Sequence, residues 1–173
     1  MISRRILLAG GAALTGLSAC GMTPTTSKLR TGQHPQVTSL VVQKSKRRLL
    51  LLDRGAEIAS FGIALGRNPV GPKEREGDGR TPEGSYYITR LNPNSHYHLA
   101  LGISYPSTLD VAHARARGVS PGGDIFIHGQ PEGVTGAQRI QGDWTAGCIA
   151  VSNQEIERIY ALVQPGTPIL IQA

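Results

Sequence analysis

Two stretches, IFIHG at residues 125–129 and GDWTAGCIAVSN at residues 142–153, decide how this chain folds and what chemistry it can carry. The short apolar run in the first stretch is typical of a buried strand, so we expect His128 at a strand end. Gly147 permits a tight backbone turn directly before Cys148. The fold can therefore bring a thiol and an imidazole together, and a neighbouring imidazole can hold the pKa of a cysteine well below its free value of about 8.5.

His128-Gly129, followed after a loop by TAGCI at residues 145–149, resembles the signature of the YkuD-type L,D-transpeptidases of bacterial cell walls. In that family a histidine precedes a Ser or Thr and then a Gly-Cys pair. TPEGSY at residues 81–86 also resembles a stretch that recurs ahead of a strand in the family. Two positions depart from the pattern, since Ala146 stands where many members have a second histidine and Ala150 where most have Arg or Asn.

The resemblance implies that Cys148 is the nucleophile, that His128 is its general base and that the carbonyl of Gly129 orients the imidazole. The backbone N–H groups of Gly147 and Cys148 can face the oxyanion of a tetrahedral intermediate. In the family, the thiol attacks the bond between meso-diaminopimelate and a terminal D-alanine in a peptidoglycan stem peptide. We therefore expect a cysteine-dependent L,D-transpeptidase that cross-links or remodels the cell wall through a thioacyl-enzyme, without a cofactor.

Other functions stay open on the same residues. The acceptor in the family is a second stem amine, a lipoprotein lysine or water, and the Gly-Cys-x-Ala ending resembles a branch that includes hydrolases detaching lipoproteins from peptidoglycan. A hydrolase, either an L,D-carboxypeptidase or an amidase, is therefore the alternative. A lipoprotein that binds peptidoglycan without processing it would not need both Cys148 and His128. Outside any such function, Cys148 would be an apolar filler and His128 a buried structural histidine.

The N-terminus has the pattern of an export signal. Arg4 and Arg5 precede an apolar run over residues 6–17 that is too short to span a bilayer core of about 30 Å. LSAC at residues 17–20 resembles a lipobox, which predicts a lipoprotein signal peptide over residues 1–19. The alternatives are an uncleaved anchor or an ordinary signal peptide. A lipoprotein would be exported and anchored in the membrane on the periplasmic or cell-wall side.

Lipidation would use Cys20, so Cys148 would be the only thiol of the mature chain and no disulfide could form within it. Residues 20–36 are polar and contain Thr, Ser, Pro and Lys, which predicts a flexible tether after the lipid. Residues 37–173 remain as one L,D-transpeptidase-like catalytic domain. Loss of Arg4 and Arg5 lowers the formal net charge from +6 to +4.

The hydrophobic pattern predicts a β-rich α+β fold. Apolar and alternating runs indicate strands over 37–43, 48–53, 57–65, 98–104 and 167–171, and helical patterns cover 108–117 and 152–163. Gly, Pro and charged residues over 66–80 predict a loop at the rim of a site. With the resemblance, these elements are expected to form a single YkuD-like mixed β-sheet or barrel domain with two modest helices.

Several side chains are candidates for substrate contacts. Arg80, Arg139 and Arg115 could steer stem carboxylates, although each could equally be a solvated surface charge. Thr145 and Trp144 lie close to the thiol in sequence, and the indole could pack under the loop or line the cleft. These expectations make stem peptides the main partner. The membrane is a second expected partner, and a lipoprotein that serves as acceptor or substrate is a third candidate.

Two further histidines, His96 and His98, lie two residues apart and would point the same way from a strand. That spacing could chelate a metal, but no Cys or acidic cluster accompanies them, so no metal site is expected. His98 could instead reach the cleft as a substrate contact. Export and an aromatic content of 5% argue against nucleic acid as a partner.

Overall fold

A computed structural model describes residues 36–173 of the chain. The expected signal peptide over 1–19, the lipidated Cys20 and all but the last residue of the tether lie outside the described residues and stay predictions. Neither helix in the described part has the length and apolar character that crossing a membrane requires.

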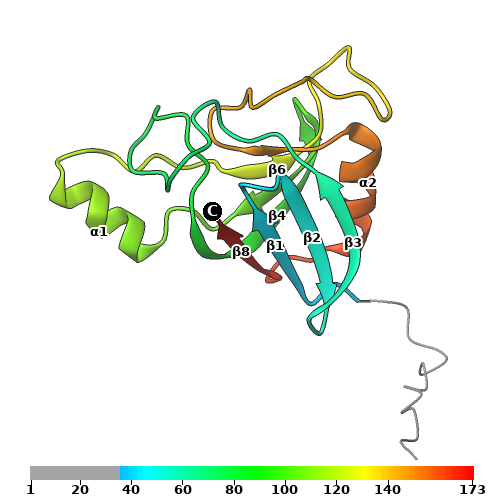
Figure 1. Cartoon of the computed structure of the whole chain (residues 1–173), viewed down its shortest axis with the longest axis horizontal. Coiled ribbons are helices and arrows are strands. Elements are labelled where there is room, and N and C mark those ends of the chain that lie inside the picture. Colours follow the sequence, from blue (N-terminus) through cyan, green and yellow to red (C-terminus); the bar gives the residue numbers. More distant parts are fainter. Residues whose placement is uncertain (1–35) are drawn as a thin grey trace, which may run out of the picture. The chain divides into compact units, whose positions relative to one another are not determined.

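The described residues form one mixed sheet of eight strands in the order β3-β2-β1-β8-β4-β5-β6-β7 (Figure 1). The β1–β8 and β6–β7 pairs are parallel and the others are antiparallel. The strands are β1 (Ser39–Gln43), β2 (Arg48–Asp53), β3 (Ala56–Gly62), β4 (Gly84–Ser95), β5 (His98–Ile103), β6 (Phe126–His128), β7 (Ile149–Ala150) and β8 (Pro168–Gln172). The helices are α1 (Thr108–Ala116) and α2 (Asn153–Leu162). The expected β-rich fold with two helices is confirmed.

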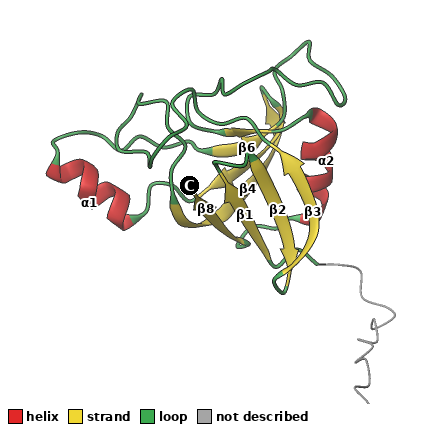
Figure 2. Cartoon of the chain, viewed as in Figure 1, coloured by secondary structure: helices red, strands yellow, loops and turns green. Residues whose placement is uncertain are grey.

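The sheet curls so that its two end strands approach each other. Bridges join Ala64 to Ala150 and Gly66 to Thr145, linking the segment after β3 with β7 and the turn before it. Figure 2 shows the long loops gathered beside β6, at one end of the strands. This closure places the loop after β3 against the segment that carries Cys148.

The core follows from the alternation of apolar residues along the strands. Leu40 and Val42 of β1 are buried, as are Leu49 and Leu51 of β2, because successive side chains of a strand point to opposite faces. Helix α2 packs against β5, and its buried Ile156 belongs to the same core. Each helix begins with a capping box, Ser107 with Asp110 in α1 and Ser152 with Glu155 in α2.

The hairpin between β4 and β5 differs from the prediction. Residues 92–95 are of types common in turns, but β4 continues to Ser95, and irregular pairing around Asn92 and Ser95 accommodates Pro93. The turn lies at His96 and Tyr97 instead. His98 begins β5 with a φ of +70° and His96 lies in the turn, so the expectation that His96 and His98 share one strand is wrong.

The loop between β3 and β4 is held by a buried lysine. Lys44, at the end of β1, is 2% exposed, and its Nζ donates to Gly71 O at 2.6 Å, Thr81 O at 2.9 Å and Glu83 Oε1 at 2.8 Å. All three ammonium protons are therefore used. One interior cation joins the middle of the loop, at Gly71, to its C-terminal end, at Thr81 and Glu83.

We expect Lys44→Met to lower the free energy of unfolding by about 3 kcal/mol, because it leaves a carboxylate and two carbonyl groups without their donor. Lys46→Met is the matched control, since Lys46 lies two residues away and is exposed. Urea unfolding followed by circular dichroism measures both. Equal losses in the two variants would show that the buried bonds contribute little.

Candidate active site

Cys148 and His128 line one pocket of about 520 Å³. The imidazole comes from the end of β6 and the thiol from the turn just before β7, and these two strands pair directly. The tip of the β4–β5 hairpin forms another wall of the pocket. The two side chains proposed from sequence to react together therefore face the same space.

His128 is held in one tautomer. Its Nδ1 lies 2.7 Å from the carbonyl oxygen of Gly129, and because a carbonyl only accepts, Nδ1 must carry the proton. The lone pair is then on Nε2. The side chain is 3% exposed, and this burial lowers the pKa of His128 more than the Gly129 bond raises it. The imidazole is thus a neutral base at neutral pH.

Two aromatic rings cover the imidazole. The Tyr97 ring centroid lies 4.5 Å from that of His128 with a tilt of 33°, and the Trp144 ring meets it nearly edge-on at 5.8 Å. Gly129 allows this close packing, because a Cβ there would lie 2.9 Å from Tyr97 O and 2.5 Å from Asn153 Oδ1. Residues of the hairpin turn and of α2 therefore pack directly against Gly129, which follows His128.

The turn before Cys148 requires glycine. Gly147 has a φ of +142°, and a Cβ on it would lie 2.7 Å from the carbonyl oxygen of Arg80. The Thr145 hydroxyl spans the turn, accepting from Gly147 N at 3.1 Å and donating to Cys148 O at 2.7 Å. Thr145 therefore fixes the backbone of the nucleophile and has no hydroxyl proton left for a substrate.

This bond changes the expected oxyanion site. The Gly147 N–H points to Thr145 Oγ1 and not into the pocket. The Cys148 N–H makes no hydrogen bond within residues 36–173, so it is the donor available to an oxyanion. The prediction of two donors is replaced by one backbone donor from the turn.

The thiol is protonated in its present environment. Burial raises the pKa of Cys148, and the Asp124 charge adds to this, while a hydrogen bond with the Phe126 backbone and the Lys73 charge lower it. The Sγ donates to Asp124 O at 3.5 Å, and within the described residues it makes no hydrogen bond to His128. Reaction therefore requires the thiol to rotate toward Nε2 and give up its proton there.

Of the substrate contacts expected from sequence, Trp144 and Thr145 line the pocket with Cys148. Arg80, Arg139 and His98 do not. Arg80 Nη1 donates to Pro72 O at 3.2 Å, Arg139 pairs with Glu155 of α2, and His98 Nε2 lies 2.7 Å from Glu157 Oε1. Each of these side chains is occupied by an intramolecular partner that the sequence pattern did not reveal.

The two departures from the family pattern lie in different places. Ala146 is exposed and lines the pocket of Cys148. Ala150 is buried on β7 and lines a separate pocket of about 230 Å³ together with Arg47 and Arg139. Ala150 therefore does not line the pocket of Cys148, and Ala146 is the departure that changes its wall.

Among the residues of the pocket wall that sequence reasoning missed are Arg67, His96, Tyr97 and Asp124. Asp124 has a φ of +54° after two glycines, and a backbone strained in this way often marks a site. Tyr97 is an aromatic residue in a hairpin turn, and although it is 38% exposed, its ring packs against that of His128. Arg67 directly follows the segment that pairs with β7, and only the closure of the sheet brings it to the pocket.

Comparison with known proteins agrees with this geometry. Residues 38–171 match the family model YkuD, the L,D-transpeptidase catalytic domain. The chain belongs to this family. It is 29% identical over 152 residues to the Escherichia coli (strain K12) protein "Putative L,D-transpeptidase YafK", an overlap of 84% of the chain and 55% of that protein. The chain thus spans about half the length of this curated relative.

Solved structures of the same fold include the helical cell shape determining protein Pgp2 from Campylobacter jejuni. Its TM-score is 0.60 at 26% identity, over 80% of this chain and 52% of that one. Bd1075 from Bdellovibrio bacteriovorus has a TM-score of 0.57 at 23% identity, over 79% of this chain and 48% of that one, and this likeness concerns the fold alone. Membership of the YkuD family supports a peptidoglycan-related activity of the L,D-transpeptidase type.

We expect Tyr97→Ala to raise the pKa of His128 toward its ordinary value of about 6.5, because burial is what lowers it and the tyrosine ring supplies part of that burial. An NMR titration of the imidazole resonances measures the change. Tyr87→Ala is the control, since Tyr87 is 58% exposed on β4. An unchanged titration in Tyr97→Ala would mean that the ring does not shield the base.

Proposed function

We propose that this chain is a cysteine-dependent L,D-transpeptidase that acts on the meso-diaminopimelate–D-alanine bond of peptidoglycan stem peptides. The observation that carries the proposal is the common pocket of Cys148 and His128, with Nδ1 bound to the Gly129 carbonyl so that Nε2 can accept a proton. Membership of the YkuD family supports the substrate class.

The acylation step follows from these groups. His128 Nε2 takes the thiol proton as Sγ attacks the carbonyl carbon of diaminopimelate, and the oxyanion that forms can accept a hydrogen bond from the Cys148 N–H. The carbon–nitrogen bond then breaks, and the amine of D-alanine leaves with the proton from His128. The product is a thioester between Sγ and the stem.

Deacylation repeats the proton transfers in reverse. An acceptor amine attacks the thioester carbonyl, Nε2 removes a proton from that amine, and Sγ leaves as a thiolate that is reprotonated. An amine from a second stem gives a cross-link. The neutral imidazole and the neutral thiol are therefore both restored at the end of a cycle.

Two charges of the pocket wall suit such a substrate. Arg67 and Asp124 both line the pocket, and the Asp124 side chain is 87% exposed. The free end of meso-diaminopimelate carries an ammonium and a carboxylate on one carbon. One cation and one anion in the wall can recognise that zwitterion, and its ammonium group would share the Asp124 carboxylate with Arg90, whose Nη2 lies 3.5 Å from Asp124 Oδ1 in an exposed ion pair.

Hydrolysis is the second candidate, and Ala146 favours it. The exposed methyl group lies in the pocket wall where many family members have a second histidine. The wall therefore offers no polar side chain at this position to hold an incoming amine. Water would then complete the reaction and release a trimmed stem.

The nucleophile is tested with Cys148→Ala. We expect this variant to lose release of D-alanine from tetrapeptide muropeptides and to form no thioacyl adduct by mass spectrometry, because no other thiol lies in the described part of the chain. Tyr87→Ala serves as the active control. Dimers would identify a transferase and trimmed stems a hydrolase, whereas turnover by Cys148→Ala, or binding without any conversion by the wild type, would refute the proposal.

We expect Arg67→Met to raise KM about tenfold for stems with a free diaminopimelate carboxylate, the effect of losing one charge-assisted hydrogen bond. Stems in which that carboxylate is amidated should respond much less. Arg54→Met, at an arginine whose side chain is 68% exposed in the β2–β3 turn, controls for loss of charge. Equal effects on both stems would exclude Arg67 as the carboxylate contact.

A further inference from the structure

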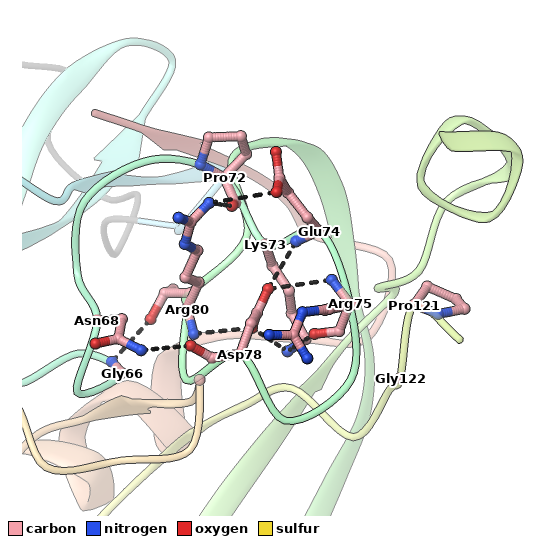
Figure 3. A network of polar contacts seen from close by, with 12 residues as sticks. Gly66, Asn68, Pro72, Lys73, Glu74, Arg75, Asp78, Arg80, Pro121 and Gly122 are labelled. Atoms are coloured by element: carbon pink, nitrogen blue, oxygen red, sulfur yellow. Dashed lines mark hydrogen bonds and ion pairs between the residues drawn. The ribbon is translucent and has the colours of Figure 1, made fainter. Parts of the chain in front are cut away.

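A buried ion pair lies in the loop between β3 and β4 and has no part in the proton transfers described above. Lys73 Nζ lies 2.8 Å from Asp78 Oδ1, with side chains that are 4% and 8% exposed (Figure 3). Burial of two charges is costly unless the geometry is good and further hydrogen bonds satisfy both groups. This pair meets both conditions, which makes the loop well defined despite its polarity.

Asp78 is the centre of the loop's hydrogen bonds. Its carboxylate accepts from the backbone N–H groups of Glu74 at 2.8 Å, Arg75 at 3.1 Å and Arg80 at 3.0 Å. Lys73 Nζ also donates to Arg75 O at 3.1 Å. Burial alone would raise the pKa of Asp78, but these donors lower it to about 2, so the carboxylate stays charged at neutral pH.

The loop that Asp78 organises forms the support of the nucleophile turn. A Cβ on Gly147 would lie 2.7 Å from Arg80 O, and one on Gly66 would lie 2.1 Å from Gly79 O and 3.1 Å from the Cα of Gly147. At both positions the backbones are so close that a Cβ atom would not fit between them. Displacement of the segment from Asp78 to Arg80 would therefore displace Gly147 and the thiol that follows it.

We propose that the Lys73–Asp78 pair is a positioning element for the nucleophile. Asp78 fixes the loop against which the Gly147–Cys148 turn packs, and the Lys73 ammonium group, bonded to Asp78 Oδ1 and Arg75 O, holds that carboxylate in place. This inference rests on the proposed thiol chemistry of Cys148 and assigns to a remote loop part of the work of activating it.

The two ends of the pair act on different neighbours. The Lys73 charge lowers the pKa of the Cys148 thiol against the larger, raising effect of burial. The Asp78 charge instead adds to the effect of burial that raises the pKa of Tyr105. The cationic end is thus the one that acts on the nucleophile. Because the pair is buried, salt screens this effect much less than that of the exposed Asp124.

The test is the pH dependence of Cys148 alkylation by iodoacetamide in the full chain, with peptide mass spectrometry to separate Cys148 from Cys20. The double variant Lys73→Gln/Asp78→Asn keeps hydrogen-bonding groups and removes both charges. We expect its alkylation midpoint to rise by about half a pH unit or more, the effect of one partly screened charge. We also expect kcat to fall while KM changes little.

Two controls separate charge from loss of structure. Lys73→Arg keeps the cation and should keep the wild-type midpoint. Arg48→Gln/Glu57→Gln removes an exposed ion pair on β2 and β3 and should change neither the midpoint nor kcat. A wild-type midpoint in a folded Lys73→Gln/Asp78→Asn variant would overturn the proposal. If that variant unfolds, Lys73→Gln is compared with Lys73→Arg at a temperature where both are folded, and equal midpoints overturn it.

Alkylation needs no substrate, so the result is independent of the proposed reaction. Wild-type protein that fails to convert muropeptides would refute the proposed function and leave the comparison of midpoints intact. A shifted midpoint without a change in kcat would refute the catalytic part of the inference, because positioning of the thiol must appear in turnover.

Discussion

The site depends on one close backbone contact, the approach of the Arg80 carbonyl to Gly147, where a Cβ would lie 2.7 Å from the oxygen. Only glycine permits it, and it holds the nucleophile turn against the loop after β3. That loop is held in turn by two buried lysines, Lys44 through Gly71, Thr81 and Glu83, and Lys73 through Asp78. The sheet supplies the frame, but interior charges in a polar loop set the position of the thiol.

Burial shifts the pKa values of the two groups proposed to react, and it shifts them in opposite directions. Burial disfavours the charged form of each group, so it raises the pKa of Cys148 and lowers that of His128. Both are neutral before substrate binds. A neutral thiol resists oxidation better than an exposed thiolate, and a neutral imidazole is ready to accept a proton. The pair therefore reacts by proton transfer once a substrate brings the groups together.

The sequence predicted most strands, both helices and the shared location of His128 and Cys148, because these depend on local periodicity, caps and the Gly147 turn. It placed Arg80, Arg139 and His98 wrongly, since each pairs with a residue that only the tertiary structure brings near. Tyr97 was missed because its contact with His128 arises only when the β4–β5 hairpin pairs with β6. Local pattern predicts the strands, the helices and the common pocket of Cys148 and His128. The partners of long polar side chains depend on contacts across the fold.

The acceptor is decided on the side of the pocket that the aromatic residues leave open. Tyr97 and Trp144 shield His128, but the exposed Ala146 lies in the wall beside the thiol and offers no polar group. Water could therefore reach a thioester on Cys148 from this open side of the pocket. An amine acceptor would react in preference to water only if its binding to the pocket outweighs the much higher concentration of water. In the proposed reaction, selection between transfer and hydrolysis then depends on how well the pocket wall binds a second stem, and not on the thiol or its base.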